Sequence, residues 1–325
     1  MDLTTADFDV VTLGETMIRL SPPLNETLET ARQFDVHIGG SEANTAVGLA
    51  RLGLRVAWLS RLTDNPLGRS ISGAIARFGV DTRYIAWTAE DRVGTYYYEP
   101  AVSPRVGQVI YDRAHSAFSK MQPTHLPADL FETNRAKLLH LTGITPAVGA
   151  GEAALAALER AKRAGWRVSF DFNYRAKLWA LETALAGCEP FMRQADILFI
   201  SRTEAQLLYH LNDSQAILDH FHRHYPQAFI VLTMGSDGAA ALRPDRERAT
   251  CAIFPAQEIG RLGRGDAFSA GVLYGYLSGF PLDTALRWGA ACAALKSTTP
   301  GDLPLFTLDE VRHLAEGQQR SGVNR

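Results

Sequence analysis

The chain has 325 residues, of which 46% are hydrophobic and 21% charged, and its formal net charge is −2. This length provides for one large α/β domain or two small ones with a substantial core. Because the charges nearly balance and no basic block stands out, nucleic acid is excluded as a main partner.

The three cysteines, Cys188, Cys251 and Cys292, are far apart and form no C-x-x-C pair, which favours a reducing compartment. The first residues lack a basic region followed by an apolar run, and no segment approaches the roughly 18 apolar residues that span a membrane. We therefore expect a cytoplasmic protein without a membrane partner.

The first predicted elements are short strands. Residues 8–13 (FDVVTL) form a β-branched run closed by glycine and predict a central strand. Residues 17–20 and 34–38 alternate apolar and polar side chains instead, which predicts half-exposed strands of a separate small sheet.

A glycine pair precedes the first predicted helix, in the segment GGSEANTA at residues 39–46. Gly39 and Gly40 would let the backbone approach a ligand, and Asn44 offers a hydroxyl both a donor and an acceptor. A plain turn with a helix cap explains the same residues at least as well.

Two further strand-like runs, 93–99 and 108–113, complete the small sheet. Tyr96, Tyr111 and Arg113 would share one face of it. The tyrosines suit packing within the sheet and contact with a ligand equally. Arg113, an arginine among aromatic residues, is suited to holding a carboxylate with two hydrogen bonds.

The strand–helix rhythm then resumes and reaches a buried run at 167–173. Asp171, Asn173 and Arg175 alternate at its carboxyl end, where ligands bind in parallel sheets. We expect them to face one crevice, with a solvated turn as the alternative.

Two more strands are predicted at 196–200 and 229–234. Ser201 and Glu204 follow the first and form the pattern of a helix capping box. The second strand leads into a glycine turn, and this segment contains Thr233, Gly235 and Gly238.

The segment GRGDAFSAG at residues 263–271 opens an apolar helix. Gly263 and Gly265 permit a tight turn close to a ligand, and a helix N-terminus favours anions, phosphates above all. A carboxylate beside an anion site suits a general base, although an N-cap role for Asp266 explains an isolated Gly-x-Gly-Asp equally well.

Strands that alternate with helices predict an α/β fold with a doubly wound, mainly parallel sheet flanked by helices. The small sheet would be an inserted lid, with strands within 15–40 and 91–118. We expect one domain over residues 8–319 and a frayed tail at 320–325. Since no G-x-x-x-x-G-K-[ST] segment is present, a P-loop kinase is excluded.

Several of these segments resemble motifs of the ribokinase-like (PfkB) carbohydrate kinases. Residues 263–271 resemble the family's G-A-G-D-x-F-x-x-G, and residues 39–46 its G-G-x-x-x-N-x-A, in the expected order. Residues 111–117, 171–179 and 300–302 resemble the Y-x-R-x-x-S-A, D-x-N-x-R…L-W and P-G-D of the 2-keto-3-deoxygluconate kinases within that family.

The resemblance implies an ATP-dependent kinase that uses Mg²⁺ and phosphorylates 2-keto-3-deoxygluconate at its 6-hydroxyl. Asp266 would deprotonate the sugar hydroxyl, while the backbone of Gly263, Arg264 and Gly265 would form an anion hole for the transferred phosphoryl group. The lid would close over the sugar and carry the interface of any homo-oligomer.

The remaining candidate residues divide between the two substrates. On the sugar side the resemblance, together with the strand patterns, points to Gly39, Gly40, Asn44, Tyr96, Tyr111, Arg113, Asp171, Asn173 and Arg175. On the nucleotide side it points to Ser201, Glu204, Thr233, Gly235 and Gly238, with Glu204 reaching the metal ion through water.

Three departures from the family patterns lie at the phosphate end: Arg264 replaces the usual alanine, Ser201 an asparagine, and Gly260 a frequent aspartate. They favour a competing interpretation, a sugar-acid-binding protein without kinase activity. Asp266 and the two loop glycines oppose it.

Fructokinase is the alternative within the enzyme class. A neutral hexose would leave Arg113 and Arg175 without an anion, and we therefore expect a sugar acid.

Overall fold

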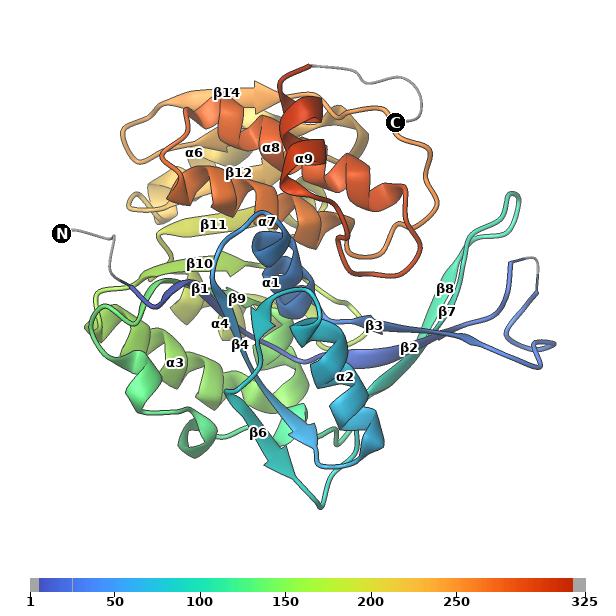
Figure 1. Cartoon of the computed structure of the whole chain (residues 1–325). Helices are drawn as coiled ribbons and strands as arrows, with labels where there is room; N and C mark the ends of the chain where they lie inside the picture. The colour runs from blue at the N-terminus through green and yellow to red at the C-terminus, as the bar shows by residue number, and fades with distance from the viewer. Residues whose placement is uncertain (1–5, 25, 318–325) are drawn as a thin grey trace.

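The computed structural model describes residues 6–24 and 26–317 and has a large mixed sheet at its centre (Figure 1). Within these residues ten strands join the sheet. Nine follow the order β14 (Arg248–Cys251), β13 (Ala239–Leu242), β12 (Phe229–Thr233), β11 (Ile197–Ser201), β10 (Arg167–Asp171), β9 (Ala136–Thr142), β1 (Phe8–Leu13), β4 (Val56–Thr63) and β5 (Val80–Asp81), and β6 (Ile85–Thr88) pairs with β4.

The sheet is parallel from β12 to β5, and only β13 runs against the other strands, so that its pairs with β12 and β14 are antiparallel. Chain order reverses at β1, which has β4 on one side and β9 on the other. In a doubly wound sheet, ligands bind at the carboxyl ends of the strands beside such a reversal. The fold places the candidate site there.

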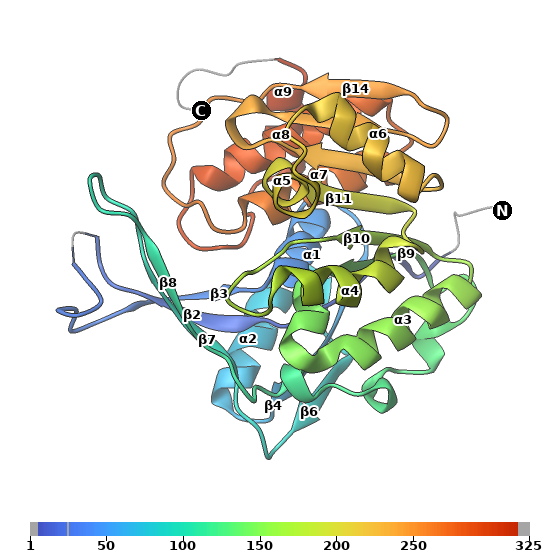
Figure 2. The same ribbon diagram turned by 180° about the vertical axis from the view of Figure 1, so that it is seen from behind.

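Helices cover both faces of the sheet, because the central strands are apolar on both sides (Figures 1 and 2). In β1, Val10 packs into one core, whereas Val11 and Leu13 pack into the other. One layer contains α1 (Ser41–Arg51), α2 (Pro66–Ala76), α7 (Arg264–Leu277), α8 (Leu282–Ser297) and α9 (Leu308–Ala315). The other contains α3 (Gly151–Arg163), α4 (Leu181–Met192), α5 (Arg202–Tyr209) and α6 (Ser214–His224).

A separate small sheet extends from one side of the body (Figure 1). Its strands follow the order β3 (Asp35–Gly39), β2 (Met17–Ser21), β7 (Thr95–Glu99) and β8 (Gln108–Asp112). We call this four-stranded sheet the lid. The predicted fold class, with its large parallel sheet and small inserted sheet, is confirmed.

The prediction that residues 17–20 are half-exposed was wrong for most of them. Met17, Ile18 and Arg19 are buried, because β2 lies between β3 and β7 and packs against the body. Arg19 is accommodated there by an ion pair with Asp302 at 2.9 Å. The alternation of polar and apolar side chains reflected this buried pair, not contact with water.

The strand β13 is one of the elements that the sequence did not predict. The strand β13 has the sequence AAAL, which lacks the β-branched residues that mark strands. It forms because β12 and β14 pair with it on either side.

The predicted tail at 320–325 lies outside the described residues. Among those that are described, no helix has the length and apolar character needed to cross a membrane.

A tight contact between α7 and α8 explains the glycine that ends the segment at 263–271. A Cβ atom on Gly271 would lie 2.6 Å from the backbone oxygen of Trp288. We expect Gly271→Ala to lower the free energy of unfolding by about 1–3 kcal/mol, since the helices would have to separate. Urea unfolding measures this change.

Gly73→Ala in α2 is the matched control, because a Cβ atom there meets nothing within 4 Å. It should leave stability unchanged or raise it by about 0.5–1 kcal/mol. Equal effects of the two substitutions would contradict the packing explanation.

Candidate active site

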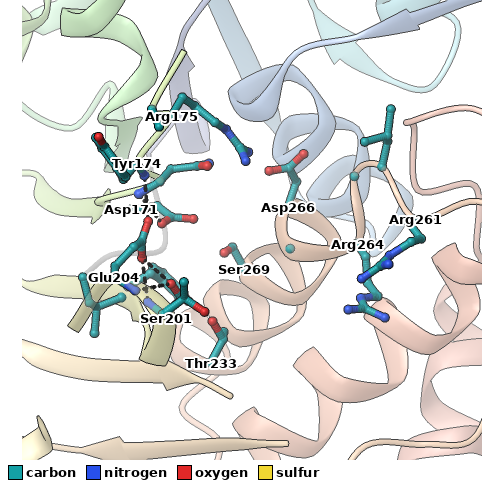
Figure 3. A pocket seen from close by; sticks show the side chains of 18 of the residues that line it. Asp171, Tyr174, Arg175, Ser201, Glu204, Thr233, Arg261, Arg264, Asp266 and Ser269 are labelled. Atoms are coloured by element: carbon teal, nitrogen blue, oxygen red, sulfur yellow. Dashed lines mark hydrogen bonds between the residues drawn. The ribbon is translucent and has the colours of Figure 1, made fainter. Parts of the chain in front are cut away.

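Two adjoining cavities lie at the carboxyl edge of the large sheet and meet at Arg175 and Asp266. The larger has a volume of about 600 Å³ and lies between the ends of β10, β11 and β12 and the start of α7 (Figure 3). The smaller, of about 110 Å³, lies between the lid and the start of α1. A ligand spanning both would pass the Asp266 carboxylate.

The first turn of α7 faces the larger cavity. Gly263 has a φ of 80°, and a Cβ atom there would lie 1.9 Å from the backbone oxygen of Asp302, so only glycine fits. Nothing lies within 4 Å of a Cβ atom built on Gly265. Because the first turn of a helix has free N–H groups, those of Gly265 and Asp266 are available to an anion.

One of the amides predicted for the anion hole already has a hydrogen-bond partner in the protein. The amide of Arg264 donates to the backbone oxygen of Arg261 at 3.3 Å and is therefore engaged. The Arg264 side chain lies 3.4 Å from Glu258 and runs beside Arg261, away from Asp266 (Figure 3). Arg264 lines the cavity without reaching the carboxylate that would act as the base.

Asp266 is held by side chains from the start of α1. Ser41 Oγ donates to one carboxylate oxygen and Asn44 Nδ2 to the other, both at 2.6 Å. Asn173 Nδ2 donates to Ser41 Oγ at 2.9 Å, which connects β10 to the same network. The residues predicted from three separate segments are thus brought together. Asp266 is oriented by others instead of capping its own helix, for which no side-chain cap is formed.

Buried carboxylates surround the larger cavity. Burial raises the pKa of Asp266, and the hydrogen bonds from Ser41 and Asn44 oppose that shift. Burial also raises the pKa of Asp171 well above its usual range, with the neighbouring charges of Glu204 and Asp266 adding to the effect. The site as folded therefore favours a bound cation or proton.

The lid contributes one wall of the smaller cavity. Tyr96 and Tyr111 face each other across β7 and β8, with ring centroids 5.8 Å apart, and both line the cavity. The Arg113 guanidinium lies 5.5 Å from the Tyr111 ring. The predicted shared face is confirmed for this group.

Arg113 and Arg175 differ in their partners. Arg113 donates through Nε and Nη2 to Glu15, so its charge is already balanced within the protein. Arg175 lines both cavities and forms no ion pair with any residue in 6–24 or 26–317, and its guanidinium points toward Asp266 (Figure 3). The charge of Arg175 is therefore available to meet a ligand's negative charge.

Ser201 and Glu204 form the predicted capping box at the start of α5. One Glu204 oxygen accepts from the Ser201 amide and hydroxyl, both at 2.7 Å, and the other accepts from the Tyr174 amide at 2.7 Å. Both residues also line the larger cavity, so the capping role and a ligand role are compatible. Burial raises the pKa of Glu204.

Of the other three residues predicted for the nucleotide side, one lines the larger cavity and two do not. Thr233 lines the larger cavity. Gly235 and Gly238 do not, and lie in the turn that follows β12 with φ values of 63° and 90°. Their left-handed backbone explains why glycine stands at both positions.

The residues fit a magnesium ion that is bound mostly by water and phosphate. In the described part of the chain, no three His, Cys, Asp or Glu side chains are grouped to hold a metal ion by themselves. Mg²⁺ usually keeps several waters and takes one or two carboxylates together with substrate phosphates. Asp171 and Glu204 supply carboxylates at the cavity, and Glu204, with three protein donors, would reach the ion through water.

Sequence reasoning missed several residues of this site. Ser41 and Asp302 line the smaller cavity, and Asp302 accepts hydrogen bonds from Tyr96 at 2.6 Å and Arg19 at 2.9 Å. The P-G-D segment was a signal for Asp302, whereas a serine in a glycine turn is too common to single out. Glu15, the partner of Arg113, follows the first strand and carried no signal of its own.

Comparison with known proteins decides the family. The sequence model described as "pfkB family carbohydrate kinase" matches residues 7–305. The chain belongs to this family. The kinase is 38% identical to a protein of Haloferax volcanii named "2-dehydro-3-deoxygalactonokinase", over 98% of this chain and 99% of that protein.

Solved structures agree with this assignment. A "2-dehydro-3-deoxygluconokinase" from Thermotoga maritima superposes with a TM-score of 0.86 at 32% identity, covering 95% of the kinase and all (100%) of that chain. A putative ribokinase II from E. coli, solved with ATP and Mg²⁺, superposes with a TM-score of 0.85 over 95% and 99% of the two chains. Since the two chains are only 20% identical, this superposition shows a shared fold and no more. The protein is thus a sugar kinase, a phosphotransferase of the ribokinase-like fold.

Glu42, at the start of α1, is a fully buried carboxyl group behind the site. One oxygen accepts from the Thr142 hydroxyl at 2.8 Å and the Thr145 hydroxyl at 2.7 Å, while the other has no hydrogen-bond partner. Burial raises its pKa to about 7. A charged residue within an apolar helical pattern is the signal that could have identified it.

The raised pKa makes a prediction for stability. The unfolded carboxyl ionises near pH 4.5 and the folded one near 7, so the contribution of Glu42 to stability is lost as the pH rises between these values. Glu42→Gln should therefore gain stability relative to the natural protein by up to about 3 kcal/mol from pH 5 to pH 8. Denaturant unfolding at several pH values tests this; a difference that does not change with pH would contradict it.

Proposed function

We propose that this kinase transfers the γ-phosphoryl group of ATP to the 6-hydroxyl of a 2-keto-3-deoxy sugar acid, 2-keto-3-deoxygluconate or its C4 epimer. The observation that carries the proposal is Arg175, an arginine without an ion-pair partner among the described residues, beside Asp266 where the two cavities meet. An arginine in such a place would bind the carboxylate of a sugar acid. The names of the relatives in Haloferax volcanii and Thermotoga maritima support the same class of substrate.

Asp266 would be the general base. The sugar hydroxyl would give its proton to the Asp266 carboxylate as its oxygen attacks the γ-phosphorus, and the bond from that phosphorus to the β-phosphate oxygen would break to release ADP. Ser41 and Asn44 orient the carboxylate. Burial, by raising its pKa, makes it a stronger base than an exposed aspartate.

The amides of Gly265 and Asp266 would stabilise the charge on the transferred phosphoryl group. They stand at the N-terminus of the 14-residue helix α7, whose dipole favours negative charge there. When bound, Mg²⁺ would neutralise charge on the phosphate oxygens. Asp171 and Glu204 face the cavity in which those phosphates would lie.

The smaller cavity would hold the sugar. Gly39 and Gly40 line it with no side chains, so the backbone can approach the substrate closely, and Asn44 lies beside Asp266. Tyr96 and Tyr111 would cover the sugar from the lid. Since Arg113 is paired with Glu15, it would contribute only the face of its guanidinium that Glu15 leaves open.

Turnover with a panel of acceptors tests the proposal. ADP release in the presence of MgATP would be measured with 2-keto-3-deoxygluconate, 2-keto-3-deoxygalactonate, fructose, ribose and adenosine. Turnover with a keto acid and not with fructose supports the role of Arg175. Turnover with fructose or ribose alone would keep the base and overturn the substrate class. Sugar-acid binding without turnover would favour the non-enzymatic interpretation.

Arg175→Gln should lower kcat/KM for the sugar acid by about 10- to 100-fold, the effect expected for one charge-assisted hydrogen bond. Steady-state kinetics with the active keto acid measure this loss. Arg77→Gln, at an exposed position after α2, is the matched control and should behave as the natural protein. An unchanged kcat/KM in Arg175→Gln would show that the carboxylate binds elsewhere.

Asp266→Asn should lower kcat by about 10²- to 10⁴-fold, the range that general-base catalysis contributes, while the sugar acid still binds. Asp283→Asn in the exposed first turn of α8 is the control for loss of an aspartate charge. Calorimetric titration with the sugar acid separates binding from turnover. Retention of full turnover in Asp266→Asn would remove it from the role of base.

A further inference from the structure

Lys296 is a fully buried lysine at the end of α8, with 0% of its surface exposed. Lysine is almost never buried completely unless it is paired. Yet within residues 6–24 and 26–317 no carboxylate forms an ion pair with Lys296. Lys296 is also neither the proposed base nor part of the proposed anion hole. Burial lowers its pKa to about 8, so it still carries its proton at neutral pH.

The ammonium group of Lys296 is bound by backbone oxygens instead. Nζ donates to the carbonyl of Gly260 at 3.3 Å and to that of Thr299 at 3.2 Å. A Cβ atom on Gly260 would lie 2.4 Å from the Thr299 oxygen and 3.2 Å from Nζ. Because residue 260 is glycine, the segment that contains Gly260 and the segment that contains Thr299 can both approach the ammonium group.

The segments that contain Gly260 and Thr299 support the proposed anion hole at the start of α7. Residues 259–263 lead directly into α7, and the amides of Ile259 and Gly260 donate to Ser297 O at 2.8 and 3.0 Å. Further along, Gly263 packs against the backbone of Asp302. The loop that presents the first turn of α7 therefore rests on the end of α8, with the charge of Lys296 between them.

We propose that Lys296 is a positioning residue for phosphoryl transfer: its ammonium group holds the 259–263 loop against α8 and so fixes the Gly265 and Asp266 amides. It would also place a positive charge beneath the bound phosphates at neutral pH. Carbonyl oxygens that converge on an ammonium group would equally suit a free monovalent cation. Because Lys296 fills that place, the kinase should not depend on added K⁺ or NH₄⁺. The inference rests on the proposed function, since the amides must form the anion hole.

A simpler role would be to stabilise the end of α8, where carbonyls lack partners and positive charge is favourable. That role predicts lower stability upon substitution and no specific effect on catalysis. Kinetics with added ions distinguish the positioning role from this simpler role. In a Lys296 variant, an ion of suitable size can replace the missing ammonium group only if the carbonyl oxygens still converge.

The test uses Lys296→Met and the more polar Lys296→Gln. Each should lower kcat by about 10- to 100-fold, the loss expected from a slight misplacement of catalytic groups, with little change in the KM of the sugar acid. Excess KCl or NH₄Cl should restore most of the activity, whereas tetramethylammonium chloride, too large for the site, should not. The natural protein should respond equally to all three salts.

Lys137→Met is the matched control, because Lys137 is a half-buried lysine that pairs with Asp9 at 2.8 Å near the amino end of β9. Its kcat should equal that of the natural protein in every salt. A normal kcat in both Lys296 variants would overturn the proposal. So would a loss that neither K⁺ nor NH₄⁺ reverses, or variants that stay unfolded even with these ions.

Hydrogen exchange of residues 259–266 provides a second measurement that needs no sugar. Exchange there should be faster in the Lys296 variants and slow again with K⁺ or NH₄⁺. If the natural protein phosphorylates no sugar acid but this pattern is found, the proposed function fails while the role of Lys296 in holding the loop stands. If the sugar acid is phosphorylated and exchange is unaltered, only the inference on Lys296 fails.

Discussion

The hydrogen bonds from Ser41 and Asn44 to Asp266 join the first turns of two helices whose residues are 225 and 222 positions apart in the chain. The two cavities of the site adjoin at this contact, since Asp266 lines both. It brings the amides of α7 beside the start of α1, and through Asn173 it extends to the end of β10. Because the carboxylate accepts hydrogen bonds on both oxygens, its position is set by the fold before a substrate arrives, as the proposed base catalysis would require.

The electrostatics of the site follow from the same packing. Asp171, Glu204 and Asp266 are brought together at low solvent exposure, and burial raises the pKa of each. A site of this kind repels an anionic nucleotide unless cations accompany it. The guanidinium of Arg175 points toward Asp266 (Figure 3), and Lys296 contacts the 259–263 loop through the Gly260 carbonyl.

The lid is joined to the body by buried charges. Arg19 of β2 and Tyr96 of β7 both bind Asp302, which follows α8, and Arg113 binds Glu15 after β1. Ion pairs of this kind contribute less to stability than to the choice of one arrangement, because desolvation offsets much of their attraction. They hold the lid over the smaller cavity in a defined register, with Tyr96 and Tyr111 facing it.

The sequence by itself determined the α/β class, the small separate sheet and the glycine loop with its aspartate, because periodicity, glycine spacing and polar residues at strand ends are local properties. It also indicated Asp171, Asn173 and Arg175 as one group, since alternation places them on one side of the chain. Tertiary structure alone decided that Arg113 is neutralised by Glu15 while Arg175 is not, and that Arg19 is buried against Asp302. It alone placed Glu42 and Lys296 in the interior. These outcomes depend on contacts between residues 98 or more positions apart or on contacts with backbone oxygens, and neither kind of contact leaves a pattern along the chain.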